Sequence, residues 1–401
     1  MFEHIVLRRA EGGDSISAGQ IAEALLYYQK LHLIIDRTTL FNLIRQIGID
    51  HILTLIRRNG VSAVYCEEML ATHTTIYAAT EFHGYAEITL AGDKDNRLDT
   101  PQERLQFELE RQELQKKDVK RFVRDFFQLV PVRKFSGNYY LNGGIVRAAE
   151  QDLFDDVYIR QALRQAIEVM PGGYSVDHEL KFELLKSDKG FCIFTNINFN
   201  QINKKRAELS PALEPIKIAH LLTNILDSRA DLALSSYYGG DFVTSAVNSS
   251  IIQIRHAELL RRAKLNQDSR QQFIEVTLPD TPSLAEVIDS GERTFDDFLK
   301  LLDQSARFKD WLNTVNPDEN LIRTYLRDVS SEGWIQRLPA KSVRYMFTTA
   351  IEATFKATHP AAGLVAGIVD SFLLDRIFAG WRPNHFVSKR LSPFVNSQKI
   401  K

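Results

Sequence analysis

Alternation of apolar and polar residues predicts several strands and one hairpin in this chain. In the clearest case, Leu180, Phe182 and Leu184 alternate with polar residues before a turn, and a second alternating strand returns over residues 191–199. Short apolar or alternating runs elsewhere predict further strands. These lie at residues 25–35, 61–65, 82–90 and 273–278.

Apolar residues at helical spacing predict helices in every part of the chain. Gly48 predicts a break inside the first of them. Thr100, Pro101 and Glu103 have the order of a capping box with a first-turn proline, which marks the start of a long helix. The expected helical segments are residues 38–58, 101–129, 148–170 and most of 211–266, followed by helices that begin after Thr294 and after Asn316.

Together these elements predict an α+β protein with three regions. Residues 1–130 are expected to form an α/β domain that ends in the long helix. Residues 131–279 combine helices with the antiparallel β-hairpin. The boundary near residue 280 rests on the sequence PDTPSL, and residues 280–401 are expected to form a helical C-terminal domain.

The segment 360–381 carries a stripe of small residues. Gly363, Gly367 and Ser371 share one face at helical spacing, while apolar residues cover the other faces. Small residues let another backbone approach closely, and tryptophan and arginine are frequent interface anchors. The expected interface residues are Gly363, Gly367, Ser371, Trp381 and Arg382.

A membrane-active helix is the alternative for the same segment. Asp370, Asp375 and Arg376 would each cost about 2.5–3.5 kcal/mol at the centre of a bilayer, which exceeds what the neighbouring apolar residues return. The sequence therefore favours burial against protein, and a membrane is not an expected partner. An effector that disturbs membranes through residues 360–381 stays open as an alternative.

Charge and cysteine content restrict the function classes. The chain has 401 residues and a net charge of −1, which argues against a protein that coats nucleic acid, although a nucleic-acid partner stays possible. Cys66 and Cys192 are the only cysteines, so the sequence has neither a disulfide framework nor a cysteine zinc cluster. The first residues lack a signal-peptide pattern, and a cytoplasmic location is expected.

Charge is divided unevenly near the C-terminal end. Residues 266–330 contain 13 acidic and 7 basic residues, whereas residues 331–401 contain 4 acidic and 10 basic residues. Complementary patches on one chain favour either contact within one domain or head-to-tail contact between subunits. A protein partner or a homo-oligomer is therefore expected.

Acidic residues follow three predicted strands of the N-terminal region. Asp36 ends one apolar strand, Glu67 and Glu68 follow the next, and Asp93 comes after a third. Acids at the carboxyl ends of parallel strands meet at one edge of a sheet. Carboxylates there can hold Mg²⁺ or Mn²⁺ for phosphodiester hydrolysis. The candidate catalytic residues are Asp36, Glu67 and Glu68, and the candidate metal ligands are the same three residues with Asp93.

This order of acids resembles that of PIN-type ribonucleases over a short part of the chain. The resemblance implies a divalent-metal nuclease, but Asp36-Arg37-Thr38 replaces the opening motif of that family. Arg37 equally allows a simple ion pair with Asp36, and Asp36 or Thr38 could cap the following helix. Phosphate-binding glycine motifs are absent, and no cofactor is expected unless the nuclease hypothesis holds.

The sequence favours a cytoplasmic interaction or assembly protein, with a bacterial stress-response or phage-defence system as one setting. The metal-dependent nuclease and the membrane-disturbing effector are the alternatives. No strong catalytic signature decides between these three hypotheses.

Overall fold

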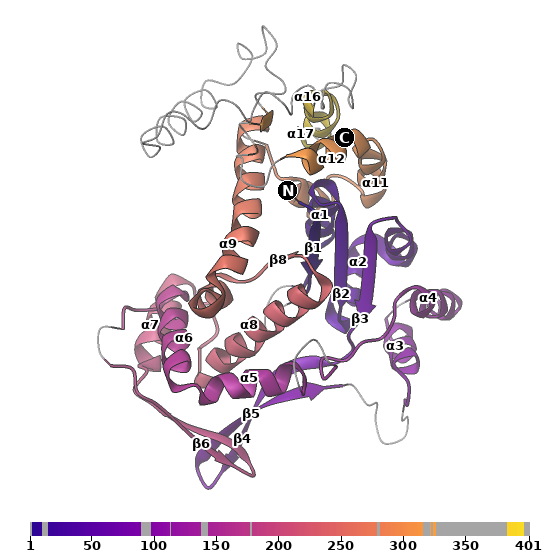
Figure 1. Ribbon diagram of the computed structural model, residues 1–401. Coiled ribbons are helices and arrows are strands. Elements are labelled where there is room, and N and C mark those ends of the chain that lie inside the picture. Colours follow the sequence, from indigo (N-terminus) through magenta and orange to yellow (C-terminus); the bar gives the residue numbers. More distant parts are fainter. Residues whose placement is uncertain are drawn as a thin grey trace, which may run out of the picture. The chain divides into compact units, whose positions relative to one another are not determined.

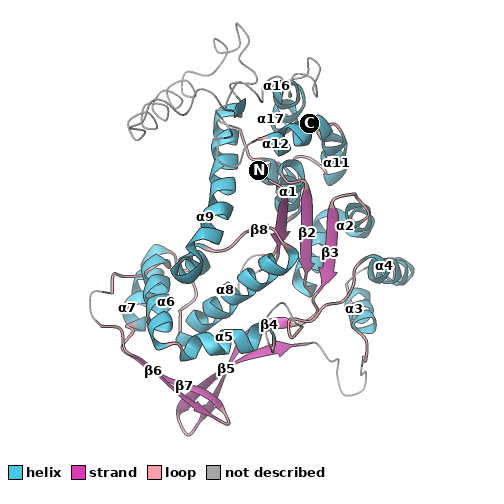
Figure 2. Ribbon diagram, viewed as in Figure 1, coloured by secondary structure: helices cyan, strands magenta, loops and turns pink. Residues whose placement is uncertain are grey.

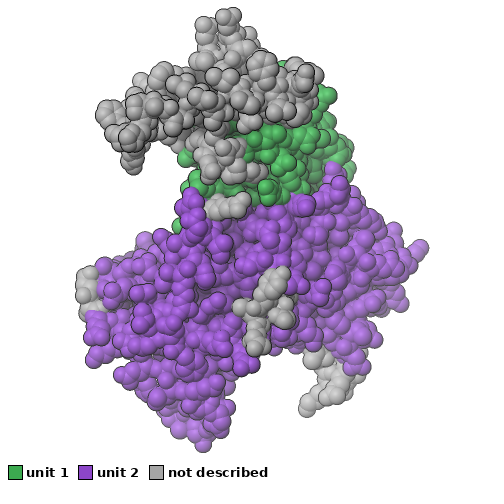
Figure 3. Space-filling model, in the orientation of Figure 1, with its two compact units in different colours: residues 1–3, 18–29, 264–401 green, residues 4–17, 30–263 purple. Residues whose placement is uncertain are grey.

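The computed structural model describes most of the chain and divides it into two compact units. The described residues are 2–9, 15–89, 98–112, 114–137, 143–176, 179–278, 281–315, 321, 324–325 and 383–396. Unit 1 comprises residues 1–3, 18–29 and 264–401, and unit 2 comprises residues 4–17 and 30–263 (Figure 3). The expected α+β class is confirmed. The expected domain boundaries stay a prediction.

Unit 2 contains a parallel sheet, sheet A, with the strand order β3-β2-β1-β8 (Figure 2). Its strands are β1 (His4–Leu7), β2 (Lys30–Ile35), β3 (Val61–Tyr65) and β8 (Asp241–Phe242). All but the first residue of β2 are buried, and such continuous apolar runs are typical of parallel strands that are covered on both faces. The strands expected at residues 31–35 and 61–65 are confirmed.

Helix α2 (Arg37–Ile56) is the crossover that joins β2 to β3. Its N-cap residue is Asp36, whose side chain accepts a hydrogen bond from the Thr39 N–H. Gly48 has φ 78° and ψ 162°, which interrupts the helix where the sequence predicted a break.

A second, antiparallel sheet of unit 2, sheet B, has the strand order β4-β5-β7-β6. The predicted hairpin is confirmed as β6 (Phe182–Ser187) and β7 (Gly190–Thr195). Strand β5 (Thr80–Ile88) pairs with β4 (Met69–Tyr77), which the sequence analysis missed. In the core, the Tyr85 hydroxyl donates to the Leu222 carbonyl and ties sheet B to the helices.

Seven helical segments beyond α2 complete the described part of unit 2 (Figure 1). Helices α3 and α4 replace the single helix expected at 101–129, and α5 and α6 replace the one expected at 148–170. Thr100 forms the predicted capping box, and Asp155 caps the Tyr158 N–H at the second break. The helices are α3 (Pro101–Glu110), α4 (Lys116–Leu129), α5 (Gly144–Phe154), α6 (Asp156–Val169), α7 (Phe199–Leu209), α8 (Ile218–Tyr238) and the first part of α9 (Ala246–Thr277).

The described part of unit 1 is helical and packs around an aromatic core. Phe273 of α9 lies among Tyr27, Phe308, Trp311 and Tyr325, with ring centroids 5.1–6.5 Å away. Its elements are α1 (Ala18–Tyr27), the last part of α9, α10 (Leu284–Asp289), α11 (Phe295–Asp303), α12 (Ala306–Thr314), α16 (Pro383–Phe386), the π-helical turn Val387–Leu391 and α17 (Ser392–Asn396).

Two strand predictions are wrong, and both fall in unit 1. Residues 25–27 belong to α1 and residues 273–277 to α9. Helix α1 is buried on almost every side, so its apolar run shows no helical period and was interpreted as a strand. At Gly19, an added Cβ would lie 2.4 Å from the Ala285 carbonyl oxygen, so the glycine permits close contact between α1 and α10. The helix expected after Asn316 begins outside the described residues.

Because His32 is buried, we expect the free energy of unfolding of unit 2 to fall in mild acid. The His32 ring stacks on Tyr238 at 3.8 Å, and its Nδ1 hydrogen-bonds with the Ser62 hydroxyl at 2.8 Å. Burial, with a smaller contribution from the charge of His4, lowers the pKa of His32 to about 4. The unfolded chain therefore takes up this proton first as the pH falls from 6.5 to 4, and unfolding becomes easier by roughly 3 kcal/mol.

Urea titrations between pH 7 and pH 4 check this prediction. His32→Asn, which keeps a polar group near Ser62, should remove the part of the pH dependence that His32 contributes across this window, roughly 3 kcal/mol. His51→Asn on helix α2 is the matched control and should keep it. Equal slopes for the His32→Asn variant and the wild type would contradict the prediction.

Candidate active-site edge of the parallel sheet

The carboxyl ends of the strands of sheet A bring charged residues to one edge. Arg8 and Arg9 follow β1, Asp36 and Arg37 follow β2, and Glu67 and Glu68 follow β3. Ligand sites of open parallel sheets are usually formed at this edge. The strand ends on which the candidate acids lie are therefore those that the sequence predicted.

Asp36 is fully engaged by protein groups. Its Oδ1 accepts from the Thr39 N–H at 2.6 Å, and its Oδ2 accepts from Arg9 Nε at 2.8 Å. The side chain thus caps α2, which was one of the two roles that the sequence allowed for it. Its ion-pair partner is Arg9 and not Arg37.

Glu67 forms a bidentate ion pair with Arg104 of α3. Arg104 Nε and Nη2 donate to the two carboxylate oxygens at 2.6 and 2.8 Å, and Arg104 Nη1 donates to the Leu98 carbonyl at 2.7 Å. The hydrogen bonds to Glu67 raise the pKa of Arg104 above its ordinary value. This pair joins the end of β3 to the first turn of α3.

Glu68 points to a different neighbourhood. Its Oε2 accepts from the Phe135 N–H at 3.0 Å, and Lys134 Nζ lies 3.9 Å from its Oε1. Burial, followed by the negative charge of Glu68, raises the pKa of Glu87 in β5. Glu67 and Glu68 are adjacent in the sequence, but their side chains therefore contact different parts of the chain.

The proposed metal centre stays a prediction. Among the residues that the structure describes, no group of three or more histidine, cysteine, aspartate or glutamate side chains is placed to hold a metal ion. Asp93 lies outside the described residues. The predicted catalytic roles of Asp36, Glu67 and Glu68 are likewise untested by the fold.

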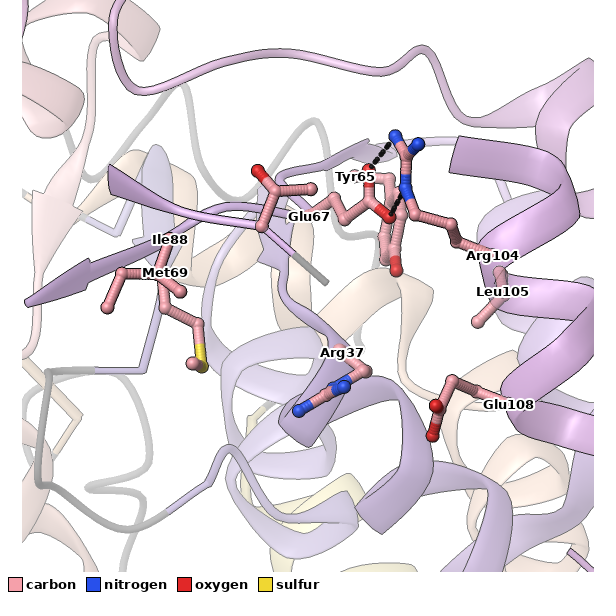
Figure 4. A pocket seen from close by; sticks show the side chains of 9 residues that line it. Arg37, Tyr65, Glu67, Met69, Ile88, Arg104, Leu105 and Glu108 are labelled. Carbon is pink, nitrogen blue, oxygen red and sulfur yellow. Dashed lines mark hydrogen bonds and ion pairs between the residues drawn. The ribbon is translucent and has the colours of Figure 1, made fainter. Parts of the chain in front are cut away.

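A half-open cavity of about 250 Å³ lies at this edge (Figure 4). Its walls come from the ends of β3 and β5, the start of β4, the first turn of α2 and one side of α3. The lining residues are Arg37, Tyr65, Glu67, Met69, Ile88, Thr89, Arg104, Leu105 and Glu108.

Two polar groups in this cavity differ from the strand-end acids. Arg37 is the first residue of α2, and no acceptor among the described residues lies within hydrogen-bonding or ion-pairing distance of its guanidinium. Tyr65 is 1% exposed, and its ring packs edge-on against Phe126 and Phe127. Its hydroxyl reaches the cavity (Figure 4) and has no hydrogen bond within the described part of the chain.

Neither group was predicted from the sequence as a site residue. Arg37 was interpreted as a partner of Asp36, and Tyr65 was interpreted only as the end of a strand. The available signal was position: a basic residue in the first turn after one parallel strand, and a tyrosine at the carboxyl end of the next.

The expected interface lies outside the described residues. This applies to Gly363, Gly367, Ser371, Trp381 and Arg382, and to the whole segment 360–381. Within the described ranges, no helix combines the length and apolar character needed to cross a bilayer. The chain matches no family model, no curated protein and no solved structure.

Proposed function

We propose that unit 2 is a ligand-binding component that holds a small molecule in the cavity at the carboxyl edge of sheet A. The observation that supports this proposal is the contrast between the groups at this edge. Asp36 and Glu67 are each held by an arginine, whereas the Arg37 guanidinium and the Tyr65 hydroxyl face the cavity without a partner among the described residues.

The ion pairs favour a structural role for the acids over metal-dependent hydrolysis. To hold Mg²⁺ or Mn²⁺, Glu67 would have to give up a bidentate contact with Arg104, and Asp36 would have to give up Arg9 and the helix cap. A lost hydrogen bond to a charged group costs about 1.5–3 kcal/mol. Carboxylates engaged in this way hold the sheet edge together.

An assembly role remains compatible with ligand binding. A protein partner or a homo-oligomer, in a stress-response or phage-defence setting, stays a prediction because the segment on which it rests lies outside the described residues. The same holds for the membrane-disturbing alternative. We therefore propose an assembly component whose unit 2 binds a small molecule in the cavity.

A nuclease assay separates the proposal from the metal-dependent alternative. The full chain should not cleave single-stranded RNA or DNA in the presence of Mn²⁺, and Asp36→Asn and Glu67→Gln should alter only its stability. Asp50→Asn, at an exposed position of α2, is the matched control. Mn²⁺-dependent cleavage that the first two variants abolish and the control retains would contradict the proposal.

A ligand screen tests the cavity directly. Thermal unfolding of the wild type is compared with that of Ile88→Trp, which enlarges a 44% exposed side chain at the cavity wall. At least one compound from a panel of nucleotides, amino acids and organic acids should raise the melting temperature of the wild type but not that of the variant. A panel without any such compound counts against ligand binding.

A further inference from the structure

Building on the proposed function, we propose that the cavity binds the oxyanion group of a small molecule, a phosphate or a carboxylate, between the Arg37 guanidinium and the Tyr65 hydroxyl. The rest of this ligand then faces the apolar side chains of Met69, Ile88 and Leu105.

The charge balance of the cavity singles out Arg37. Of the four ionisable lining residues other than Tyr65, Glu67 and Arg104 neutralise each other across two short hydrogen bonds. Glu108 has Arg111 as a neighbour at 4.0 Å. Arg37 alone of the four has no opposite charge within ion-pairing distance among the described residues. A half-buried guanidinium presents a planar set of donors that fits phosphate or carboxylate oxygens.

Tyr65 supplies an independent indication of a ligand. Its ring is fixed by Phe126 at 5.8 Å and Phe127 at 5.6 Å, both close to perpendicular. The hydroxyl is therefore held in one place, and Figure 4 shows it on the side of the ring that faces Arg37 and Glu108. Buried hydroxyls are normally hydrogen-bonded, so an acceptor on a ligand would complete this one.

Protonation keeps the Tyr65 hydroxyl a donor. Burial, then the negative charge of Glu67, raises the pKa of Tyr65 above its ordinary value of 10.0. The phenol is thus neutral at physiological pH and can donate to an oxyanion. The tyrosine and the guanidinium together offer donors from β3 and α2 to one bound group.

The start of α2 adds a favourable field at the same place. Arg37 is its first residue, and the N-terminal end of a helix favours negative charge because its first N–H groups lack intrahelical acceptors. The carboxylate at this helix end is that of the N-cap residue Asp36, which Arg9 already neutralises. An anion beside Arg37 therefore does not face an uncompensated carboxylate at the cap.

The remaining lining residues define the rest of the ligand. Met69, Ile88 and Leu105 provide apolar contact, and the Glu108 carboxylate can accept from a hydroxyl or ammonium group of the ligand. A space of about 250 Å³ corresponds to roughly eight water molecules, at about 30 Å³ each. The site thus suits a small metabolite with an oxyanion at one end and a donor group elsewhere.

Two simple anions test the proposal on the full chain. Inorganic phosphate and acetate are titrated at constant ionic strength, and binding is followed by thermal unfolding and calorimetry. At least one should raise the melting temperature of the wild type, and the stronger of the two identifies the preferred oxyanion. Arg37→Gln should weaken that binding 10-fold or more, on the order expected for a lost charged hydrogen bond, and Tyr65→Phe should weaken it several-fold.

Matched controls separate the site from general charge effects. Arg45→Gln removes the same charge from an exposed position of α2, and Tyr77→Phe removes a hydroxyl from an exposed end of β4. Both should bind as the wild type does. Circular dichroism and the melting temperature without anion confirm that Arg37→Gln and Tyr65→Phe are folded, and Tyr65→Phe keeps the ring that packs on Phe126.

The outcomes distinguish this inference from the proposed function. Equal anion responses of Arg37→Gln and Arg45→Gln, or no response of the wild type to either anion, overturn the oxyanion site. If a neutral compound binds the wild type but not the Ile88→Trp variant, the cavity is still a ligand site, but its ligand is not an oxyanion. If no compound binds either, the proposed function fails as well.

Discussion

Replacement of Arg8 by methionine is expected to lower the free energy of unfolding of unit 2 by about 3–5 kcal/mol, the range found when one partner of a buried ion pair is removed. Arg8 Nε donates to Asp231 at 2.6 Å, and Nη2 donates to Asp227 at 2.8 Å. All three side chains are buried. The variant would leave two acids of α8 without the cation that β1 supplies.

The protonation state of Arg8 supports this expectation. Burial alone would lower the pKa of the guanidinium, but the charges of Asp231 and Asp227, and their hydrogen bonds, raise it above its ordinary value. Arg8 therefore stays charged although it is buried. Thr244 also donates to Asp231, at 2.7 Å, so the network extends to the segment after β8.

Urea titration followed by circular dichroism measures the effect of the Arg8 variant. Arg45→Met, at an exposed position of α2, is the matched control and should stay within about 0.5 kcal/mol of the wild type. The triple variant Arg8→Met, Asp227→Asn, Asp231→Asn removes all three charges and should recover part of the loss. An Arg8→Met protein as stable as the control, or a triple variant no more stable than Arg8→Met, would show that the buried charges do not determine stability.

Elements with one buried face were predictable from the sequence, because local pattern determines them. Residues 182–195 alternate since one face of β6 and β7 packs on the core, and Gly48 breaks α2 because it adopts a positive φ. Thr100 caps α3 through contacts within a few residues. Each of these signals lies inside its own segment.

Elements whose environment is set by distant residues were not predictable. Helix α1 lost its periodic signal because α10, α11 and α12 cover it, and the sequence does not show that contact. Most of β4 after residue 72 is exposed and rich in threonine and histidine, so it shows neither an apolar run nor a clear alternation. Tertiary contacts override local pattern in both cases.

In the candidate site, too, the features set by local sequence were predictable and the contacts with distant residues were not. The positions of Asp36 and Glu67 at the ends of neighbouring strands followed from the sequence. Their partners did not, because Arg9 and Arg104 are 27 and 37 residues away along the chain. Arg37 is a candidate binding residue because its guanidinium has no acceptor or opposite charge among the described residues. Only the fold shows this, since the sequence does not say which residues lie near Arg37.

Replacement of Phe273 by alanine is expected to destabilise unit 1 by about 3–5 kcal/mol, as for other large buried aromatic side chains. Phe273 is 0% exposed, and its ring contacts Tyr27 of α1, Phe308 and Trp311 of α12, and Tyr325. Loss of the ring removes contacts from several segments of the chain at once. The void left by the missing ring should therefore lower the stability of α1 and α12 together.

Hydrogen exchange measured by mass spectrometry provides the readout for the Phe273 variant. Peptides from α1, α10, α11 and α12 should exchange faster than in the wild type, and peptides from β2, β3 and α8 of unit 2 serve as the internal reference. Leu265→Ala, which truncates a 42% exposed side chain of the same helix, controls for substitution on α9 and should leave the pattern unchanged. If exchange in α1 matches that of the wild type, Phe273 does not hold α1 in the core of unit 1, and the aromatic cluster does not carry the stability assigned to it.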